Sequence, residues 1–531
     1  MTTNHGRDPG SRSTHELWSL REDVDVELRS AGDLVRLRSP WGEITIPRSS
    51  PAVREALHRM RLGPVSLENI PGVGSENGED SAQQRQLFQV LERLQPLVVR
   101  SVRLATGQPL LSVLPLTPRS VFRPTALSPD APIRLSAFAE LRTDGREYRL
   151  ESPLALHRVL LHRVEAVQLI GALGGPSAAG DVTTVLPGSQ AAATVALEYL
   201  IAAGMVAQAE AAPDPGELPV FAEDNELALV GWAPADLAFH VTSTAGRHDR
   251  RLGVTYPMDD AGVPWSGEPV VKPAAPRHAI TLHRPRWDDL CADDPPLTVA
   301  VEGRRSVRDH DGDPVTATEL GELLYRTCRV RWLSDTKAAS QLAPRVVAIR
   351  ELSDRPYPGG GACYELELYL TVGRCSGLRR GVYHYDPLGH RLEPVSSDPD
   401  VVDELLLSAR GAAAMDTQPQ VLITLTARIR RLSWKYEGLP YRIVLMDAGV
   451  IVQNLYLVCT AMRLAPCALG FISSELTARA FGVDWRTEPG IAQFVVGRAA
   501  ADEGHPGVWH PANDGDWADF ARAQLNPDPM S

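Results

Sequence analysis

The sequence predicts an α+β fold built around one long apolar helix over residues 442–462. This stretch is apolar on nearly every helical face, with Asp447, Gln453 and Asn454 as the polar exceptions, so we expect other elements to cover it completely. It is too polar and too interrupted for a strong membrane span. Apolar runs predict strands at residues 366–372, 381–386, 391–395, 421–426 and 493–498. No strict strand–helix–strand order and no GxGxxG or phosphate-loop motif occurs, which favours α+β over a Rossmann domain.

Composition narrows the class of protein. A chain of 531 residues has room for about two to four domains. Its net charge of −12 argues against nucleic-acid binding by the chain as a whole, since phosphate contacts need a basic face. The 6 cysteines form no CxxC pair and no metal-ligand spacing, which indicates reduced thiols and no metal site. Residues 1–16 contain no apolar signal segment, so we expect a soluble, cytoplasmic protein without a membrane partner.

The N-terminal region predicts a tail followed by a hairpin and two helices. Residues 1–22 are rich in Gly, Ser, Arg and His and are expected to form a flexible tail. Alternating runs at 33–38 and 43–46, joined by a Ser-Pro-Trp-Gly turn, predict a hairpin. A capping serine and a first-turn proline at 49–51 predict the start of a helix, and leucine spacing predicts another over 82–94.

A similar order recurs further along the chain. Arg149-Leu-Glu-Ser-Pro153 echoes Arg36-Leu-Arg-Ser-Pro40, and residues 195–206 resemble 87–98 in leucine spacing and in their exit into a strand. We infer tandem winged-helix-like units at 23–140 and 141–210. In an acidic chain such a pair favours docking of a protein or peptide over pure scaffolding, and DNA binding is the least favoured alternative.

Three further segments are expected along the rest of the chain. Residues 211–296 are rich in proline and predict a connector that follows an extended path, with an ordered stretch at 232–240. A catalytic domain is expected at 297–500, where a capped amphipathic helix begins near Thr316. Residues 501–531 are expected to form a C-terminal tail.

Three short motifs in the catalytic domain could carry chemistry. Arg304, Arg305, Ser306 and Arg308 offer three guanidinium forks and a hydroxyl, a receptor for a phosphate dianion, although a solvated basic turn has the same composition. The glycine run 359–361 lets backbone approach a flat ligand, or is only a loop.

Lys435 and Tyr436 form the third motif. A lysine partly stripped of water loses pKa, and so does a phenol beside a cation, so either could move a proton near neutral pH. The alternative is a surface lysine next to a packing tyrosine.

Together these motifs resemble the nitroreductase-like flavoproteins, and specifically the SagB-type azoline dehydrogenases that complete thiazole and oxazole rings in ribosomal peptide natural products. The resemblance spans 297–498, and the segment 236–246 also looks like a family motif. The motifs that carry it are Arg-Arg-Ser-x-Arg at 304–308, Tyr-Pro-Gly-Gly-Gly at 357–361, Gly-x-Tyr-His-Tyr-Asp-Pro at 381–387, Lys-Tyr-x-x-x-x-Tyr-Arg at 435–442, Asp-Ala-Gly-x-x-x-Gln-Asn at 447–454 and Gly-Phe at 470–471.

The resemblance implies FMN bound at a homodimer interface. Its phosphate would lie on Arg304, Arg305, Ser306 and Arg308, with a further contact from Arg498. Backbone near the flavin ring would come from Gly359, Gly360, Leu469 and Gly470. Many relatives have Pro-Ser-Gly-Gly where this chain has Pro-Gly-Gly-Gly at 358–361, so a serine contact to the flavin is missing here or replaced by backbone.

The resemblance also implies catalytic roles for Lys435 and Tyr436 in oxidising peptide thiazolines or oxazolines. Tyr436 would be the base with Lys435 lowering its pKa, or the roles would be reversed. A precursor peptide and a cyclodehydratase complex are the partners it implies. The alternatives are a nitroreductase or flavin reductase that uses NAD(P)H, and a non-catalytic scaffold of a peptide-modifying complex.

Overall fold

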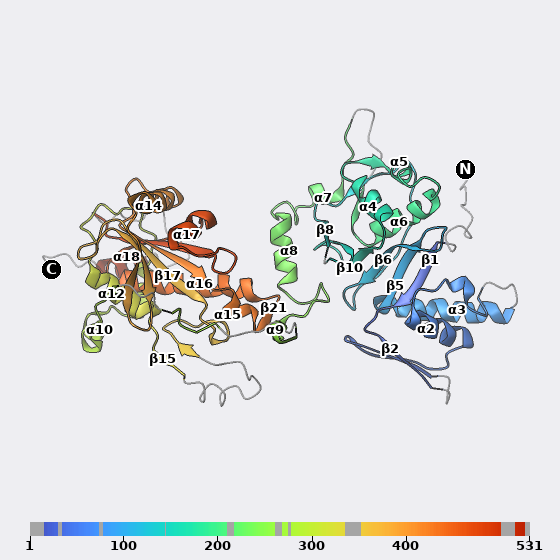
Figure 1. The fold of residues 1–531 in the computed structure, drawn as a ribbon, viewed down its shortest axis with the longest axis horizontal. Helices are drawn as coiled ribbons and strands as arrows, with labels where there is room; N and C mark the ends of the chain where they lie inside the picture. The colour runs from blue at the N-terminus through green and yellow to red at the C-terminus, as the bar shows by residue number, and fades with distance from the viewer. Residues whose placement is uncertain are drawn as a thin grey trace. The chain divides into compact units, whose positions relative to one another are not determined.

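The computed structural model describes residues 15–29, 34–73, 78–143, 145–209, 217–260, 268–273, 278–334, 352–500 and 516–525. The chain divides into two compact units, Met1–Arg250 and Arg251–Ser531, and each is described by itself (Figure 1).

The first unit contains a six-stranded antiparallel sheet in the order β1-β5-β6-β10-β9-β8. Its strands are β1 (Glu16–Leu20), β5 (Val98–Arg103), β6 (Pro109–Pro115), β8 (Glu140–Thr143), β9 (Tyr148–Glu151) and β10 (His157–Leu161). A separate meander of β2 (Asp25–Arg29), β3 (Leu34–Ser39) and β4 (Gly42–Ile46) packs with α2 (Pro51–Leu62) and α3 (Gly78–Arg93) around Leu37, Leu57 and Leu91. The predicted hairpin, with Arg38 opposite Glu43, and the serine-capped helix are confirmed.

A smaller group of elements follows in the same unit. In chain order it contains α4 (Val164–Gly171), β11 (Ser177–Ala178), α5 (Ala179–Thr183), α6 (Gln190–Ala202) and β12 (Val206–Gln208). Strand β7 (Pro132–Leu135) lies between β11 and β12. The predicted exit of a helix into a strand is confirmed, since β12 follows α6 as β5 follows α3. The winged-helix interpretation stays a prediction.

Two expectations for this unit need correction. Residues 16–20 lie in strand β1, paired along its length with β5, and so are not part of a tail, while 1–14 lie outside the described residues. The expected boundary at 140/141 falls inside β8, because the six-stranded sheet joins strands from both sides of it. Composition could not reveal this pairing, since it joins segments far apart in sequence.

The second unit is organised by a seven-stranded antiparallel sheet in the order β14-β19-β18-β17-β20-β23-β22. Its strands are β14 (Ile280–Thr281), β17 (Leu366–Val372), β18 (Gly381–Asp386), β19 (Arg391–Ser396), β20 (Val421–Ala427), β22 (Ala465–Leu469) and β23 (Gly490–Gly497). All five strands expected from apolar runs are confirmed. Two short ladders accompany the sheet: β13 (Gly253–Val254) with β21 (Tyr436–Glu437), and β15 (Trp332–Leu333) with β16 (Ser353–Asp354).

Helices cover both faces of this sheet. Alternate residues of β17, such as Leu368 and Leu370, belong to a core shared with α12 (Ala317–Cys328) and α16 (Pro440–Ala461), whereas Tyr369 belongs to a core shared with α14 (Pro399–Ala413) and α17 (Ser474–Phe481). Thr316 and Glu319 form the predicted capping box of α12. The predicted α+β class is therefore confirmed, with a sheet between two helical layers (Figure 1).

The remaining elements correct the boundaries of the connector and tail. Helices α7 (Ala222–Asn225) and α8 (Pro234–Thr242) lie in the first unit, and α8 confirms the ordered stretch expected at 232–240. The second unit adds α9 (Pro257–Asp260), α10 (Trp287–Asp293), α11 (Leu297–Gly303), α15 (Arg430–Ser433) and α18 (Asp516–Leu525). Helix α18 is not a loose tail, because Ala521 and Leu525 are buried against Val299 of α11.

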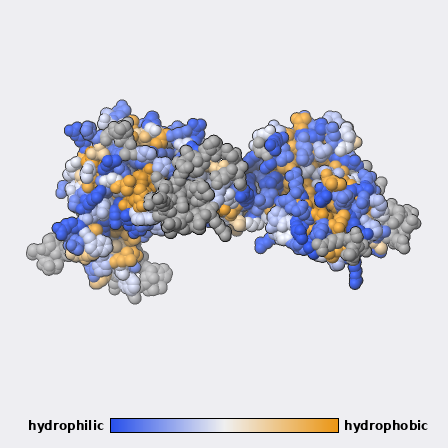
Figure 2. Space-filling model, turned by 60° about the horizontal axis from the view of Figure 1, so that its bottom comes forward, coloured by the Kyte–Doolittle hydropathy of each residue, from blue (hydrophilic) through white to orange (hydrophobic). Residues whose placement is uncertain are grey.

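The prediction that other elements cover the central helix completely is wrong. One side of α16 is buried through residues such as Val444, Ile451 and Leu455, whereas Leu445 and Met446 are 42% and 63% exposed. By length and composition α16 could cross a membrane, but the core helix of a soluble protein passes the same test. Figure 2 shows apolar areas on the surfaces of both units.

Candidate active site

The arginine segment 304–308 is held in place from two sides. The amide of Val307 donates to Pro466 O at 2.8 Å, at the start of β22. The hydroxyls of Ser306 and Tyr456 lie 2.7 Å apart, and the Tyr456 oxygen also accepts the amide N–H of Ala468 at 2.8 Å. The Arg304 guanidinium lies over the Tyr456 ring, 5.2 Å from its centroid. The segment is therefore fixed to α16 and β22 by one tyrosine.

Beyond the segment, the buried ring of His310 provides a second anchor. Its Nε2 lies 3.0 Å from Ala465 O, and its Nδ1 lies 3.2 Å from the amide nitrogen of Gln420. Burial lowers the His310 pKa to about 4, so the ring is neutral and accepts this N–H. The arginine segment is thus fastened at both ends, which preorganises its donors.

Arg305 and Arg498 line one cavity of about 220 Å³. The cavity also contains two further arginines, Arg463 and Arg522, and is lined besides by Gly303, Val307, Thr460, Leu464, Ala465, Pro466, Ala499, Ala500 and Leu525. Arg498 pairs with Glu319, yet its buried Nε finds no hydrogen-bond partner among the described residues. A cavity with several guanidinium groups and an unsatisfied buried N–H suits an anion such as a phosphate.

Arg304 and Arg308 are largely exposed and lie outside the lining of this cavity. Arg308 is close enough to Cys467 for its charge to oppose the effect of burial, which raises the pKa of that thiol. The structure therefore brings Arg305 and Arg498 together, and places Arg304 and Ser306 around Tyr456 instead.

The glycine run packs against the first half of α16. The Gly360 amide donates to Asp447 Oδ2 at 2.8 Å. A Cβ on Gly360 would collide with Ile443, and a Cβ on Gly361 would lie 2.6 Å from Lys435 Nζ and closer still to the Tyr436 hydroxyl. Gly361 also has φ of +60°. Close packing within the chain thus requires glycine at both positions, whether or not a flat ligand lies nearby.

Lys435 and Tyr436 lie directly against this loop. Lys435 Nζ donates to Gly361 O at 3.3 Å and lies 5.2 Å from the centroid of the Tyr436 ring. The pair is held from outside by Val254, which pairs with Tyr436 between β13 and β21, and by the amide of Thr255, which donates to Lys435 O at 3.1 Å. Two titratable side chains and the glycine loop therefore form one cluster.

The expectation that a neighbouring cation lowers the Tyr436 pKa is wrong. Burial raises this pKa, and so do the neighbouring Cys363, Tyr256, Asp447 and Glu365. The phenol is therefore neutral near pH 7 and can donate a hydrogen bond. These acidic neighbours come from other elements, so the dipeptide alone could not show them.

The remaining predicted residues lie at the end of β22. The Leu469 side chain is buried in the core shared with α14 and α17, so only its backbone could face a ligand. Gly470 is exposed, and a Cβ there would meet open space. Nine residues of α16 separate Asp447, at the glycine loop, from Tyr456, at the arginine segment, about 13 Å along the helix. The two groups therefore lie on one helix at separate points.

Sequence reasoning missed a buried carboxyl pair, Glu365 and Asp447. Glu365 has no exposed surface, and neither of its carboxyl oxygens has a hydrogen-bond partner among the described residues. Burial and then the Asp447 charge raise its pKa to about 7. Burial likewise raises the pKa of Asp447. The sequence could not reveal this carboxyl pair, because Asp447 lies 82 positions after Glu365.

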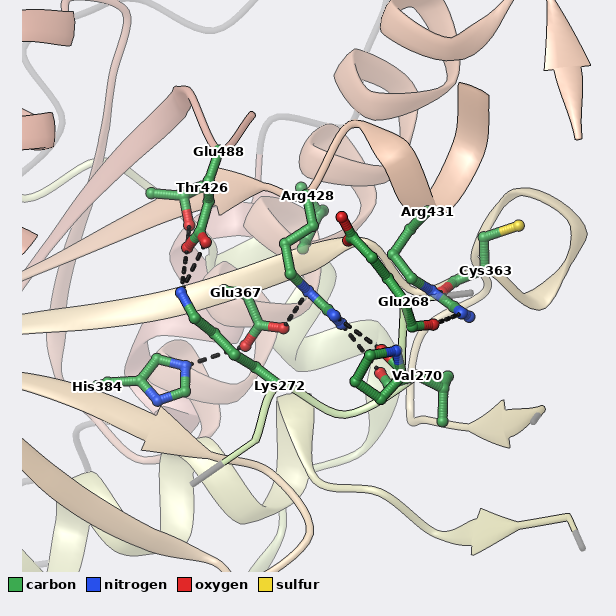
Figure 3. Close-up of polar contacts among 12 residues, drawn as sticks. Glu268, Val270, Lys272, Cys363, Glu367, His384, Thr426, Arg428, Arg431 and Glu488 are labelled. Atoms are coloured by element: carbon green, nitrogen blue, oxygen red, sulfur yellow. Dashed lines mark hydrogen bonds and ion pairs between the residues drawn. The ribbon is translucent and has the colours of Figure 1, made fainter. Parts of the chain in front are cut away.

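A buried network of charges fastens residues 268–272 to the rest of the second unit (Figure 3). Arg431 donates to Glu268 O at 2.7 Å and through Nη2 to Cys363 O at 2.8 Å, and Arg428 donates to Pro269 O at 2.7 Å. Lys272 Nζ lies 2.6 Å from Glu488. Because Arg431 binds both this segment and the end of the glycine loop, the network fixes the loop's far side.

Two family models match separate parts of the chain. The model of the nitroreductase family matches residues 301–498, which contain all the site residues described above. The model of the cyanobactin oxidase ThcOx matches residues 133–249, in the first unit.

Individual relatives also match parts of this chain. A candidate nitroreductase of Methanocaldococcus jannaschii, MJ1384, is 30% identical over 174 residues, which are 33% of this chain and 78% of that protein. The microcin B17-processing protein McbC of Escherichia coli is 31% identical over 26% of this chain and 53% of its own length. The trifolitoxin-processing protein TfxB of Rhizobium leguminosarum is 26% identical over 27% of this chain. The chain spans about half of McbC and 39% of TfxB.

Among solved structures, a candidate nitroreductase from Ralstonia eutropha matches with a TM-score of 0.34 and 22% identity, over 44% of this chain and 98% of that chain. The microcin synthetase McbBCD complex of E. coli matches with a TM-score of 0.32 and 19% identity, over 50% of this chain and 91% of that one. The match to MJ1384 over most of that protein, together with the family model at 301–498, shows that this chain belongs to the nitroreductase family, a family of oxidoreductases.

Proposed function

We propose that this protein is an FMN-dependent dehydrogenase that oxidises thiazolines or oxazolines in a peptide to thiazoles or oxazoles. The observation that carries the proposal is the cluster of Lys435, Tyr436 and the glycine loop in a nitroreductase-family chain. The matches to ThcOx, McbC and TfxB support a peptide substrate, because McbC and TfxB are named for processing microcin B17 and trifolitoxin.

The arginine cavity supports FMN as the cofactor. Arg305 and Arg498 would hold its phosphate, and the unsatisfied Nε of Arg498 offers a donor that a phosphate oxygen would satisfy. Arg304 and Ser306 would support this site through their contacts with Tyr456, and Arg308 would support it through its charge. The glycine loop and the backbone at 469–470 would border the ring. Bound FMN would supply the acceptor for the hydride that leaves the former Cβ of the azoline.

The chain itself must remove the proton from the former Cα and position the ring. The raised pKa of Tyr436 favours Lys435 as the base that takes this proton. The neutral phenol of Tyr436 would donate a hydrogen bond that orients the azoline. Loss of one proton and one hydride leaves an aromatic ring, and this aromaticity drives the reaction.

The proposal includes partners. The exposed apolar side chains of α16, among them Leu445 and Met446, support a homodimer, since an exposed apolar helix face is typical of an interface. The first unit would bind the precursor peptide or a cyclodehydratase complex, in the region that the ThcOx model matches. We place the protein in the cytoplasm, in line with its cysteine spacing.

A direct test uses the purified full-length chain. We expect a yellow protein that releases FMN on denaturation and that shifts the mass of an azoline-bearing peptide by about −2 Da for each ring oxidised, the mass of the two hydrogens removed. A protein without flavin absorbance, or one that leaves the azoline mass unchanged while binding FMN, would contradict the proposal.

A second candidate is reduction of nitro compounds or flavin with NAD(P)H, which the match to MJ1384 favours. Stopped-flow spectroscopy separates the two functions. Bleaching of bound flavin by NADPH but not by an azoline peptide would support the second candidate, and the opposite pattern the first.

A further inference from the structure

Glu365 is a buried carboxyl group without a partner that could stabilise its charge. Its side chain is fully buried at the start of β17, and neither oxygen accepts a hydrogen bond from the described residues. The ion pairs of Arg428 and His384 in this part of the sheet are made with Glu367, two residues further along β17. An isolated buried carboxylate costs several kcal/mol, so such a group keeps its proton or shares one.

Two arginines whose charges act on Glu365 direct their guanidinium groups to other partners. Arg355 directs its guanidinium to Tyr357 Oη, Leu366 O and Val270 O, at 3.3–3.4 Å. Arg431 directs its guanidinium to the carbonyls of Cys363 and Glu268. Their positive charges act on Glu365 only from a distance and weaken the effect of burial without reversing it.

Asp447 is the group that Glu365 meets instead. The Asp447 charge raises the pKa of Glu365, and a proton on either carboxyl group would let it donate a hydrogen bond to the other. Asp447 Oδ2 also accepts the Gly360 amide at 2.8 Å. The pair therefore lies behind the glycine loop, whose other side meets Lys435 and Tyr436.

We propose that Glu365 and Asp447 hold a single proton between them and act as positioning residues, fixing the glycine loop through Gly360 and setting the proton affinity of Tyr436. While the proton is shared, the pair carries one negative charge and Asp447 keeps its hydrogen bond to the loop. When the proton leaves, two like charges lie side by side in the core, and Tyr436 faces one more negative charge. The role in catalysis rests on the proposed function, but the shared proton does not.

The other titratable groups around the pair are not expected to change their charge near pH 7. Burial raises the pKa of Cys363 and of Tyr357, so both stay neutral near pH 7, and the nearby Arg355 and Arg431 stay charged. Lys435 also lies against Tyr436 and the glycine loop, so a transition near neutral pH that reaches both Tyr436 and Gly360 is assigned to the carboxyl pair when it persists in Lys435→Ala.

The test is an NMR titration of the full-length, flavin-free protein from pH 5 to 9. Tyrosine labelled at ¹³Cζ and glycine labelled at ¹⁵N report on Tyr436 and Gly360, and the signals are assigned from Tyr436→Phe and Gly360→Ala. We expect both signals to shift with one midpoint near pH 7 in the wild type. We expect Glu365→Gln and Asp447→Asn to abolish the transition.

Glu393→Gln is the matched control. Glu393 is also a buried carboxyl of the second unit, but it lies beside His384 in another part of the sheet, so this variant should keep the transition. Absence of a transition in the wild type, or its persistence in Glu365→Gln, overturns the proposal. If both pair variants fail to fold, the wild-type titration alone decides. Because the readout needs neither flavin nor substrate, a failure of azoline oxidation would be seen separately.

Discussion

The hydroxyl of Ser306 lies 2.7 Å from the hydroxyl of Tyr456, and this contact connects the arginine segment to the central helix of the second unit. The same Tyr456 oxygen accepts the Ala468 amide. One side chain thus joins the segment after α11, helix α16 and strand β22. The position of the arginine segment depends on a residue about 150 positions later in the chain.

Tyr456→Phe removes this junction while keeping the ring. The Ala468 amide loses its acceptor and Ser306 loses a partner, so we expect a stability loss of about 1–3 kcal/mol. We also expect FMN affinity to fall, about tenfold for each 1.4 kcal/mol of lost positioning. Ser306→Ala is the control, because it leaves the Ala468 hydrogen bond intact and should cost less stability. Denaturant unfolding and fluorescence titration with FMN measure the two effects, and equal losses in both variants would contradict the role of Tyr456.

Arg305→Ala and Arg498→Ala each remove a guanidinium from the cavity. A charge-assisted hydrogen bond contributes about 1.5–3 kcal/mol, so FMN should bind about 10- to 150-fold more weakly. Riboflavin, which lacks the phosphate, should bind each variant as it binds the wild type. Arg486→Ala, at a surface pair with Asp484, is the control. Equal losses for FMN and riboflavin would show that these arginines hold the fold and not a phosphate.

Lys435→Ala and Tyr436→Phe test the proposed chemistry. General acid–base groups typically contribute about 10²- to 10⁴-fold in rate, so both variants should lose azoline oxidation by such factors while retaining FMN. The larger loss is expected for Lys435→Ala, because the neutral Tyr436 donates a hydrogen bond and does not accept the proton. Single-turnover bleaching of bound flavin by an azoline peptide measures this step. A greater loss in Tyr436→Phe would assign the base to the phenol.

Local patterns in the sequence predicted the elements of the second unit well. The apolar runs at β17 and β20 and the capping residues at Thr316 specify their structure from neighbours within a few positions. The same reasoning failed for the cover of α16, because apolar residues such as Leu445 and Met446 also lie on its exposed side. It also missed β1, whose pairing with β5 depends on residues about 80 positions away.

The candidate site, too, could be predicted only in part from the sequence. The glycine run and the Lys435–Tyr436 pair could be singled out as motifs, and the structure brings them together. Their electrostatics could not be predicted, because the acidic groups around Tyr436 come from separate segments of the fold. A dipeptide shows the adjacent lysine, but it does not show the burial that raises the Tyr436 pKa.

Gly361→Ala should damage the site through sterics alone. Its Cβ would lie 2.6 Å from Lys435 Nζ and would overlap the Tyr436 hydroxyl, and its φ of +60° is unfavourable for alanine. We expect a loss of azoline oxidation comparable to that of the Lys435 and Tyr436 variants. Gly411→Ala is the matched control, since this helical glycine of α14 has no atom within 4 Å of its Cβ position, and alanine there should stabilise by about 0.5–1 kcal/mol. Full activity in Gly361→Ala would show that the cluster does not depend on this close approach.

The shared proton of Glu365 also makes a prediction about stability. Its pKa is raised from 4.5 in the unfolded chain to about 7 in the folded protein. A raised folded-state pKa contributes stability that is fully present below pH 4.5 and is lost as the pH rises through about 7. At 1.36 kcal/mol for each pKa unit, the loss is on the order of 3 kcal/mol.

Glu365→Gln keeps a neutral group at this position at every pH, so it should lack this loss. The wild type should therefore become less stable relative to Glu365→Gln between pH 5 and pH 8, and the free energies of unfolding from urea titrations at several pH values measure the change. Asp447→Asn should act in the same direction, since burial also raises the pKa of Asp447. Curves for wild type and Glu365→Gln that stay parallel across this range would mean that Glu365 ionises in the folded protein as it does in the unfolded chain, and that the two carboxyl groups share no proton.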